Sequence, residues 1–120
     1  QVLTNLQKQP QTNYLQWIKA QQNESVRLIP VGDVDYFQAE DKYTLVMTAE
    51  GEFLIKKSIR ELTAELDPDK FWQIHRATIV NVAKIEEVGR TLTGRGIVKL
   101  KNRPEQLLVS RHFLHLFKQM

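Results

Sequence analysis

The sequence predicts a mainly β domain with two short helices, and three observations support this fold class. Short apolar runs recur along the chain at intervals of about 8–12 residues. Glycine, proline and asparagine separate these runs and are typical of tight turns. Only two stretches carry apolar residues at helical spacing. Short strands joined by tight turns favour antiparallel pairing, so we expect small antiparallel sheets.

The strands are expected from Tyr14 onward. Pro30 should end the second strand, because proline cannot donate to a sheet ladder. Gly51 lies in the turn of a predicted hairpin. Gly89, Gly94 and Gly96 are expected to break the later apolar runs. The predicted strands are residues 14–20, 25–31, 34–39, 44–48 and 52–56, the two apolar segments around Arg76 within 71–82, and further pieces of 86–110.

Two segments predict the helices. Ser58 followed by Glu61 forms a capping box, and Pro68 follows the end of that helix. Ser110 opens the second predicted helix, which covers residues 110–120. Their apolar stripes are Ile59, Leu62 and Leu66 in the first helix, and Phe113, Leu114, Leu116 and Phe117 in the second.

Composition and charge suggest a binding domain with a polyanionic partner. The chain has 120 residues and no cysteine, which suits one domain without disulfides. Residues 1–50 hold four Lys and Arg against six Asp and Glu, a net charge of −2, whereas residues 51–120 hold thirteen against eight, a net charge of +5. Residues 1–13 are rich in Gln, Asn and Thr, and we interpret them as a linker. Because the chain begins at Gln1, we expect a fragment of a longer protein.

The sequence argues against an enzyme. It contains no nucleophile elbow, no phosphate-binding glycine loop and no HExxH motif. His112 and His115 are three residues apart and could in principle ligate a metal, but no carboxylate or cysteine completes a ligand set. We therefore expect no catalytic residues, no metal and no cofactor.

Basic residues at the helix starts point to an anion. Helix N-termini carry partial positive charge, so cations there are unfavourable unless an anion binds. Arg111 and His112 follow Ser110, and Lys56 and Lys57 precede Ser58. Phosphate oxygens are the obvious anions. For Lys56 and Lys57, we favour the alternative interpretation of a tolerated surface charge.

The stretch FWQIHRATIVN raises a related possibility. His75 and Arg76 interrupt an apolar run, so we expect the strand to break at Arg76 and to place Arg76 and Thr78 on a loop between two buried segments. An anchored arginine can read a base edge or clamp a phosphate. Asn81 is expected to satisfy backbone groups of this loop.

A loop at residues 39–43 and two further cations complete the candidates. Lys42 offers a cation and Tyr43 a flat, hydrogen-bonding ring in that loop. Lys101 and Arg103 are weaker candidates for phosphate contacts.

Four motifs carry a family resemblance. LIPVGDVDYFQAEDKYTLVMT, SIRELTAEL, FWQIHRATIVNVAKIEEV and LLVSRHFLHLF together resemble a LytTR-type DNA-binding domain, over about residues 14–120. HRATIVN is similar to the family's His-Arg-Ser/Ala-x-x-Val-Asn signature. That family forms the output domain of many bacterial two-component response regulators.

The resemblance implies an elongated arrangement of small sheets that binds duplex DNA through loops in two successive major grooves. Carried onto this chain, it implies base contacts from Lys42, Arg76, Arg111 and His112. Backbone contacts would come from Tyr43, Lys56, Lys57, His75, Lys101 and Arg103, with His75 otherwise serving as framework and Asn81 as structural support.

The resemblance also implies a cytoplasmic transcription regulator. Residues 1–13 would link this domain to a phosphoacceptor receiver domain, and phosphorylation would dimerise the protein on repeated half-sites. The alternative is a basic protein-interaction module that docks an acidic partner, since the same loops would serve it.

Overall fold

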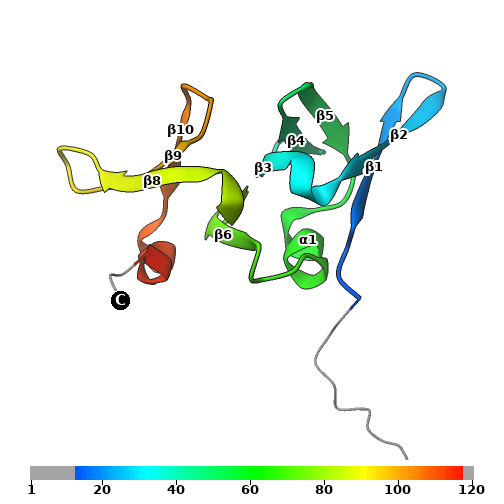
Figure 1. Ribbon diagram of the computed structural model, residues 1–120. Coiled ribbons are helices and arrows are strands. Elements are labelled where there is room, and N and C mark those ends of the chain that lie inside the picture. The colour runs from blue at the N-terminus through cyan, green and yellow to red at the C-terminus, as the bar shows by residue number, and fades with distance from the viewer. Residues whose placement is uncertain (1–12, 118–120) are drawn as a thin grey trace, which may run out of the picture.

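The computed structural model describes residues 13–117 and contains three antiparallel sheets side by side (Figure 1). The central sheet has five strands in the order β5-β4-β3-β7-β6, between a two-stranded sheet β1-β2 and a three-stranded sheet β10-β9-β8. The strands are β1 Trp17–Gln22, β2 Ser25–Pro30, β3 Val34–Ala39, β4 Thr44–Thr48, β5 Gly51–Ile55, β6 Phe71–His75, β7 Thr78–Asn81, β8 Ile85–Arg90, β9 Gly96–Leu100 and β10 Gln106–Val109. The helices are α1 Ile59–Glu65 and the 3-10 helices η2 Val31–Asp33, η3 Val82–Lys84 and η4 Arg111–Phe117. The predicted fold class is confirmed.

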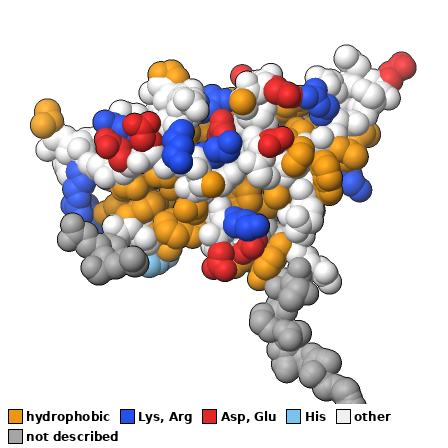
Figure 2. All heavy atoms as spheres, viewed as in Figure 1, with side chains coloured by type: hydrophobic (Ala, Val, Ile, Leu, Met, Phe, Trp, Pro, Cys, Tyr) orange, Lys and Arg blue, Asp and Glu red, His pale blue; other side chains and the backbone are white. Residues whose placement is uncertain are grey.

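The central sheet is buried on both faces, because each face meets a different neighbour. Phe37, Val46 and Ile79 belong to one hydrophobic cluster with α1 and the β1-β2 hairpin. Tyr36 and Val80 belong to a second cluster with β9, β10 and η4. Alternate residues of a strand point to opposite faces, so β3 is buried from Val34 to Phe37 without a break. Figure 2 shows hydrophobic side chains gathered between β8 and the last helix.

Helix α1 follows its sequence signal. The Glu61 N–H donates to Ser58 Oγ at 3.1 Å, and the Ser58 N–H donates to the Glu61 carboxylate at 2.9 Å, so the capping box is present. The hydrogen bond from the Ser58 N–H to the carboxylate is the main cause that lowers the pKa of Glu61. Ile59 and Leu62 are buried against the central sheet.

Several boundaries differ from the prediction. The first strand begins at Trp17 because the preceding chain runs along α1, where the Leu15 N–H donates to the Glu65 carbonyl at 2.9 Å. Gly89 and Gly96 lie within strands, and only Gly94, with a φ of +86°, lies in the turn between them. Thr78 belongs to β7 and is buried, so it is not a loop residue.

The last helix is a 3-10 helix over Arg111–Phe117 rather than an α-helix. The Phe113 N–H donates to the Ser110 carbonyl at 2.9 Å, which is the i to i+3 bond of that helix type. Three residues per turn place Leu114 and Phe117 on one edge, and both pack against the second cluster. Residues 118–120 of the predicted helix lie outside the described residues.

No helix in the described part of the chain is long and apolar enough to cross a membrane.

Candidate nucleic-acid interface

Four separate segments meet at one end of the central sheet. Ala39 pairs with Thr44, so residues 40–43 form the turn at this end. Thr44 also pairs with Ile55, which puts Lys56 and Lys57 beside that turn. Gln38 pairs with Thr78, which brings the turn at residues 76–77 alongside. The Ser110 N–H donates to the Ile74 carbonyl at 2.9 Å and fixes the start of η4 next in line. We call residues 40–43, 56–57, 75–77 and 110–112 the loop surface.

The turn that carries Arg76 is held by backbone contacts. The Ala39 N–H donates to the Ala77 carbonyl at 2.7 Å, which ties the turn to β3. The Ala77 N–H donates to His75 Nδ1 at 3.1 Å. In neutral His75 this bond assigns the ring proton to Nε2, which leaves Nε2 as a donor. Arg76 itself is exposed. The turn is therefore fixed while its arginine side chain faces solvent.

The neighbouring turn presents charges of both signs. The Glu40 N–H donates to the Tyr43 carbonyl at 2.8 Å and closes the turn. Lys42 is exposed, and 45% of Tyr43 is exposed. Glu40 and Asp41 are exposed as well. Lys42 and Tyr43 can therefore contact an anion, whereas the neighbouring Glu40 and Asp41 would repel it.

Lys56 and Lys57 differ in their surroundings. Lys57 Nζ pairs with the Glu65 carboxylate at 3.0 Å. The Lys57 backbone carbonyl accepts a hydrogen bond from Thr44 Oγ1 at 2.7 Å. Lys56 is exposed. Lys56 is consequently the better placed of the two to meet an anion.

The start of η4 adds two more polar side chains. Arg111 and His112 are both exposed. The His112 ring stands edge-on to Phe113, with the ring centroids 5.0 Å apart. Gly96 of β9 lies under this helix, and a Cβ there would come 2.6 Å from Leu114 Cδ2. The close approach of helix and strand therefore depends on glycine.

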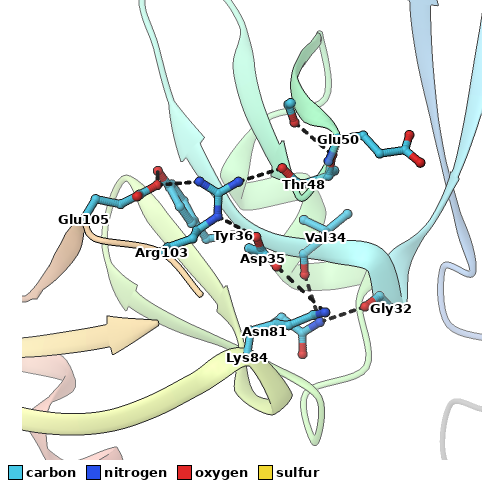
Figure 3. A network of polar contacts seen from close by, with 11 residues as sticks. Gly32, Val34, Asp35, Tyr36, Thr48, Glu50, Asn81, Lys84, Arg103 and Glu105 are labelled. Carbon is cyan, nitrogen blue, oxygen red and sulfur yellow. Dashed lines mark hydrogen bonds and ion pairs between the residues drawn. The ribbon is translucent and has the colours of Figure 1, made fainter. Parts of the chain in front are cut away.

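Lys101 and Arg103 lie in the turn between β9 and β10 of the three-stranded sheet, at the end of its strands away from the loop surface. The Lys101 N–H donates to the Lys84 carbonyl at 2.9 Å. Arg103 donates to Asp35 and Thr48, and Thr48 ends β4 away from the loop surface (Figure 3). Figure 2 shows cationic and acidic side chains intermixed over this region. The structure therefore does not bring these two predicted cations together with the others.

Asn81 supports backbone groups, but not those predicted. Its Nδ2 donates to the Val34 carbonyl at 2.9 Å and to the Gly32 carbonyl at 3.4 Å, and its Oδ1 accepts from the Ala83 N–H at 3.0 Å. Asn81 pairs with Phe71 at the far end of β7, so it cannot reach the turn at Arg76. It braces the entry to β3 instead.

Sequence reasoning overlooked Arg90 and Arg95. Arg90 pairs with Gly96, and Gly96 pairs with Val109. Both arginines therefore lie at the end of the three-stranded sheet where η4 begins. The only signal in the sequence was a basic, glycine-containing turn, whose position depends on strand pairing.

Within residues 13–117, no three or more His, Cys, Asp or Glu side chains lie together as a metal site would require.

Cations on a row of turns at one end of a mainly β fold are the arrangement that a domain binding nucleic acid through its loops would present. Residues 24–120 match the family model of the LytTr DNA-binding domain. The chain belongs to the LytTr DNA-binding domain family, which confirms the resemblance seen in its motifs.

Curated relatives and a solved structure agree with this assignment. The chain is 44% identical over 109 residues to an uncharacterised response regulatory protein of Vibrio cholerae, covering 88% of this chain and 41% of that protein. It is 30% identical over 98 residues to the transcriptional regulatory protein YpdB of Escherichia coli, covering 82% and 40%. The LytTr DNA-binding domain of a Bacillus cereus protein described as a methyl-accepting/DNA response regulator superposes with a TM-score of 0.77 at 26% identity, covering 86% of this chain and 94% of that domain. The chain thus spans about two fifths of the length of these curated relatives.

Proposed function

We propose that this DNA-binding domain is the output domain of a bacterial response regulator and reads specific duplex sequences through the loop surface. The observation that carries this proposal is the convergence of four polar, mostly cationic segments at one end of the sheet. A DNA-binding protein needs cations for phosphates and fixed side chains for base edges.

Arg76 is the principal base reader in this proposal. Its turn is tied to β3 and to His75, and guanine O6 and N7 suit a bidentate guanidinium. Lys42 and Arg111 flank it as further base contacts, with His112 beside Arg111. Four other residues of the loop surface, Tyr43, Lys56, Lys57 and His75, contact the DNA backbone in this proposal. Lys101 and Arg103 are no longer included, because they lie at the opposite end.

The geometry suits more than one groove. Adjacent strands are about 4.8 Å apart, so the turn at Lys42 and the turn at Arg76 lie on the order of 10 Å apart across β3 and β7. The start of η4 lies beyond β6 and one sheet layer away from it, so the whole row of turns is on the order of 20 Å long. A major groove is about 12 Å wide, so the row extends beyond a single groove.

The names and lengths of the relatives support a proposal for the rest of the regulator. They are response regulatory and transcriptional regulatory proteins more than twice as long as this match. In this proposal residues 1–13 join the domain to a receiver, whose phosphorylation pairs two copies on repeated half-sites in the cytoplasm. Linking two domains raises their effective concentration and the affinity of the pair.

The test is selection of binding sites from a random duplex pool, followed by gel shifts with the selected site and a scrambled competitor. We expect Arg76→Ala to weaken binding to the selected site by about 5- to 150-fold and to relax preference at one or two base pairs. Lys70→Ala is the control, because Lys70 is an exposed cation at the opposite end of the sheet. Unchanged affinity and preference in Arg76→Ala would refute the assignment.

A further inference from the structure

Arg103 makes three directional contacts from a largely buried position. Its Nε donates to Asp35 Oδ2 at 2.6 Å, its Nη1 to Glu105 Oε2 at 2.8 Å, and its Nη2 to the Thr48 carbonyl at 2.6 Å (Figure 3). The Arg103 side chain is only 17% exposed and that of Asp35 only 9%. Five donors in a rigid fork make arginine suited to such a site, whereas lysine offers one point charge.

Two of these contacts, those to Asp35 and Thr48, cross from one sheet to another. Asp35 lies on β3 and Thr48 ends β4, both in the central sheet, whereas Arg103 and Glu105 belong to the turn between β9 and β10. Tyr36 Oη also donates to Glu105 Oε2 at 3.2 Å across the same boundary. A shift in the β3-β4 register between Val34 and Tyr36 marks a bulge around Asp35, and bulges commonly redirect a side chain.

A buried ion pair is weak evidence for stability, because desolvation offsets much of the attraction. The directional hydrogen bonds of the ion pair nevertheless favour one orientation of the two sheets, which apolar packing alone does not define. Around Arg103 the two sheets also meet through an ion pair between Lys84 Nζ and Asp35 Oδ1 at 4.0 Å and through the apolar cluster that contains Tyr36, Val80, Val98 and Leu107. The arginine fork therefore ties the two sheets to each other beside these contacts.

The orientation of the three-stranded sheet affects the loop surface through one short strand, β10. β10 runs from Gln106 to Val109, directly after the Arg103 turn, and is followed by Ser110, whose N–H donates to the Ile74 carbonyl. Arg111 is the next residue. β10 is thus fixed at both ends, by the arginine fork at its start and by β6 at its end.

We propose that Arg103 is a positioning residue for DNA recognition, which sets the orientation of the three-stranded sheet and so the placement of Arg111 and His112 relative to Arg76. This inference rests on the proposed DNA contacts of the loop surface. Arg103 does not touch DNA in this proposal, because it lies beside the start of β3 and the end of β4, which is the end of these strands opposite the loop surface.

The first test measures the angle without DNA. The natural sequence has no cysteine, so spin labels can be attached at Ala64→Cys on α1 and Leu92→Cys in the β8-β9 turn, both exposed positions. We expect a narrow distance distribution in the otherwise unchanged chain and a broader or shifted one with Arg103→Lys. Arg27→Met is the control, because Arg27 pairs with Glu50 and does not reach the three-stranded sheet. An unchanged distribution in folded Arg103→Lys overturns the proposal.

The second test measures base discrimination, using duplexes that each carry one changed base pair. Arg76→Ala and Arg111→Ala identify the base pairs that each side chain reads. We expect Arg103→Lys to lose about fivefold of discrimination at the Arg111 base pairs, within the range for coupling through a packed network, and to keep it at the Arg76 base pairs.

A reduced folded fraction would lower the amount of active protein and leave both sets of preferences intact, so titration of active protein separates that effect. A uniform loss, or none, overturns the positioning role. Should Arg103→Lys fail to fold, Asp35→Asn removes the same ion pair with an isosteric side chain and gives the same readouts. If the unmodified chain selects no sequence, the proposed function fails, while the label distances still decide whether Arg103 sets the angle.

Discussion

Two glycines of the three-stranded sheet should respond oppositely to the same substitution. Gly96 of β9 and Gly89 of β8 both lie in strands at backbone angles open to alanine. A Cβ on Gly96 would lie 2.6 Å from Leu114 Cδ2 and 3.2 Å from Val109 Cβ, whereas a Cβ on Gly89 meets nothing within 4 Å. The same added methyl group therefore meets close-packed atoms at Gly96 and open space at Gly89.

The magnitude follows from the size of the overlap. The Leu114 methyl group must retreat by roughly 1 Å, and Val109 is buried and has little room to move, so overpacking at Gly96 should cost about 1–3 kcal/mol. Alanine also reduces the entropy of the unfolded chain, which contributes about 0.4–1 kcal/mol in its favour. We expect Gly96→Ala to destabilise the domain by about 1–2 kcal/mol and Gly89→Ala to stabilise it by about 0.5 kcal/mol.

The assay is urea unfolding followed by circular dichroism and by the fluorescence of Trp72, whose ring packs 5.4 Å from that of Phe117 on η4. Leu114→Ala, made alone and together with Gly96→Ala, completes a double-mutant cycle. It should cost less in the Gly96→Ala background than in the unchanged chain, because removing the leucine side chain also relieves the overlap. Equal unfolding free energies for the two glycine variants, or no coupling to Leu114, would refute the close-packing argument.

Three further predictions concern a buried amide, a tyrosine and a lysine. Asn81→Ala should lower the free energy of unfolding by about 2–4 kcal/mol in a denaturant titration, because it leaves the buried Val34 carbonyl and the Ala83 N–H without their partner; a loss below about 0.5 kcal/mol would contradict that role. Burial and the neighbouring Glu105 carboxylate raise the pKa of Tyr36 from 10.0 to about 12, so its stabilising effect is complete below pH 10 and is lost as pH rises toward 12. Unfolding free energies measured at intervals of pH between 9 and 12 should therefore fall more steeply for the unchanged chain than for Tyr36→Phe, and parallel curves would show that Tyr36 is not responsible. Lys56→Ala should reduce the slope of log affinity against log salt by about 0.9 if Lys56 contacts a phosphate, and an unchanged slope would remove it from the interface.

The sequence was most informative where local signals decide the structure. The capping box at Ser58 fixed the start of α1, and the polar break in FWQIHRATIVN placed Arg76 in a turn between buried strands. Both features depend on residues within a few positions of each other. The same local reasoning treated Gly89, Gly94 and Gly96 alike, although only Gly94 makes a turn, because the contact that requires Gly96 comes from Leu114 on a distant element.

Arg103 shows where local reasoning ends. Its sequence surroundings, a basic turn with Asn102 and Pro104, made it a candidate for a phosphate contact. Its partners Asp35 and Thr48 are 68 and 55 residues away, so no local pattern announces the ion pair. Burial would raise the pKa of Glu105, but backbone hydrogen bonding and the charge of Arg103 outweigh burial and lower it, so the carboxylate stays ionised beside its partner. A cation that already has two carboxylates has little left to offer a phosphate.

Strand direction then explains which cations reach the loop surface. Consecutive antiparallel strands place their turns alternately at opposite ends of a sheet. Lys42 in the β3-β4 turn and Glu50 in the β4-β5 turn therefore lie at opposite ends of the central sheet. The same alternation sends the β8-β9 turn toward the start of η4 and the β9-β10 turn away from it. At the far end Arg27 and Arg103 each meet a carboxylate, whereas Arg76 and Arg111 stand exposed at the loop surface. Which turns share an end depends on β3 pairing with β7, a contact across forty or more residues of sequence, and that pairing brings the turns of the loop surface together.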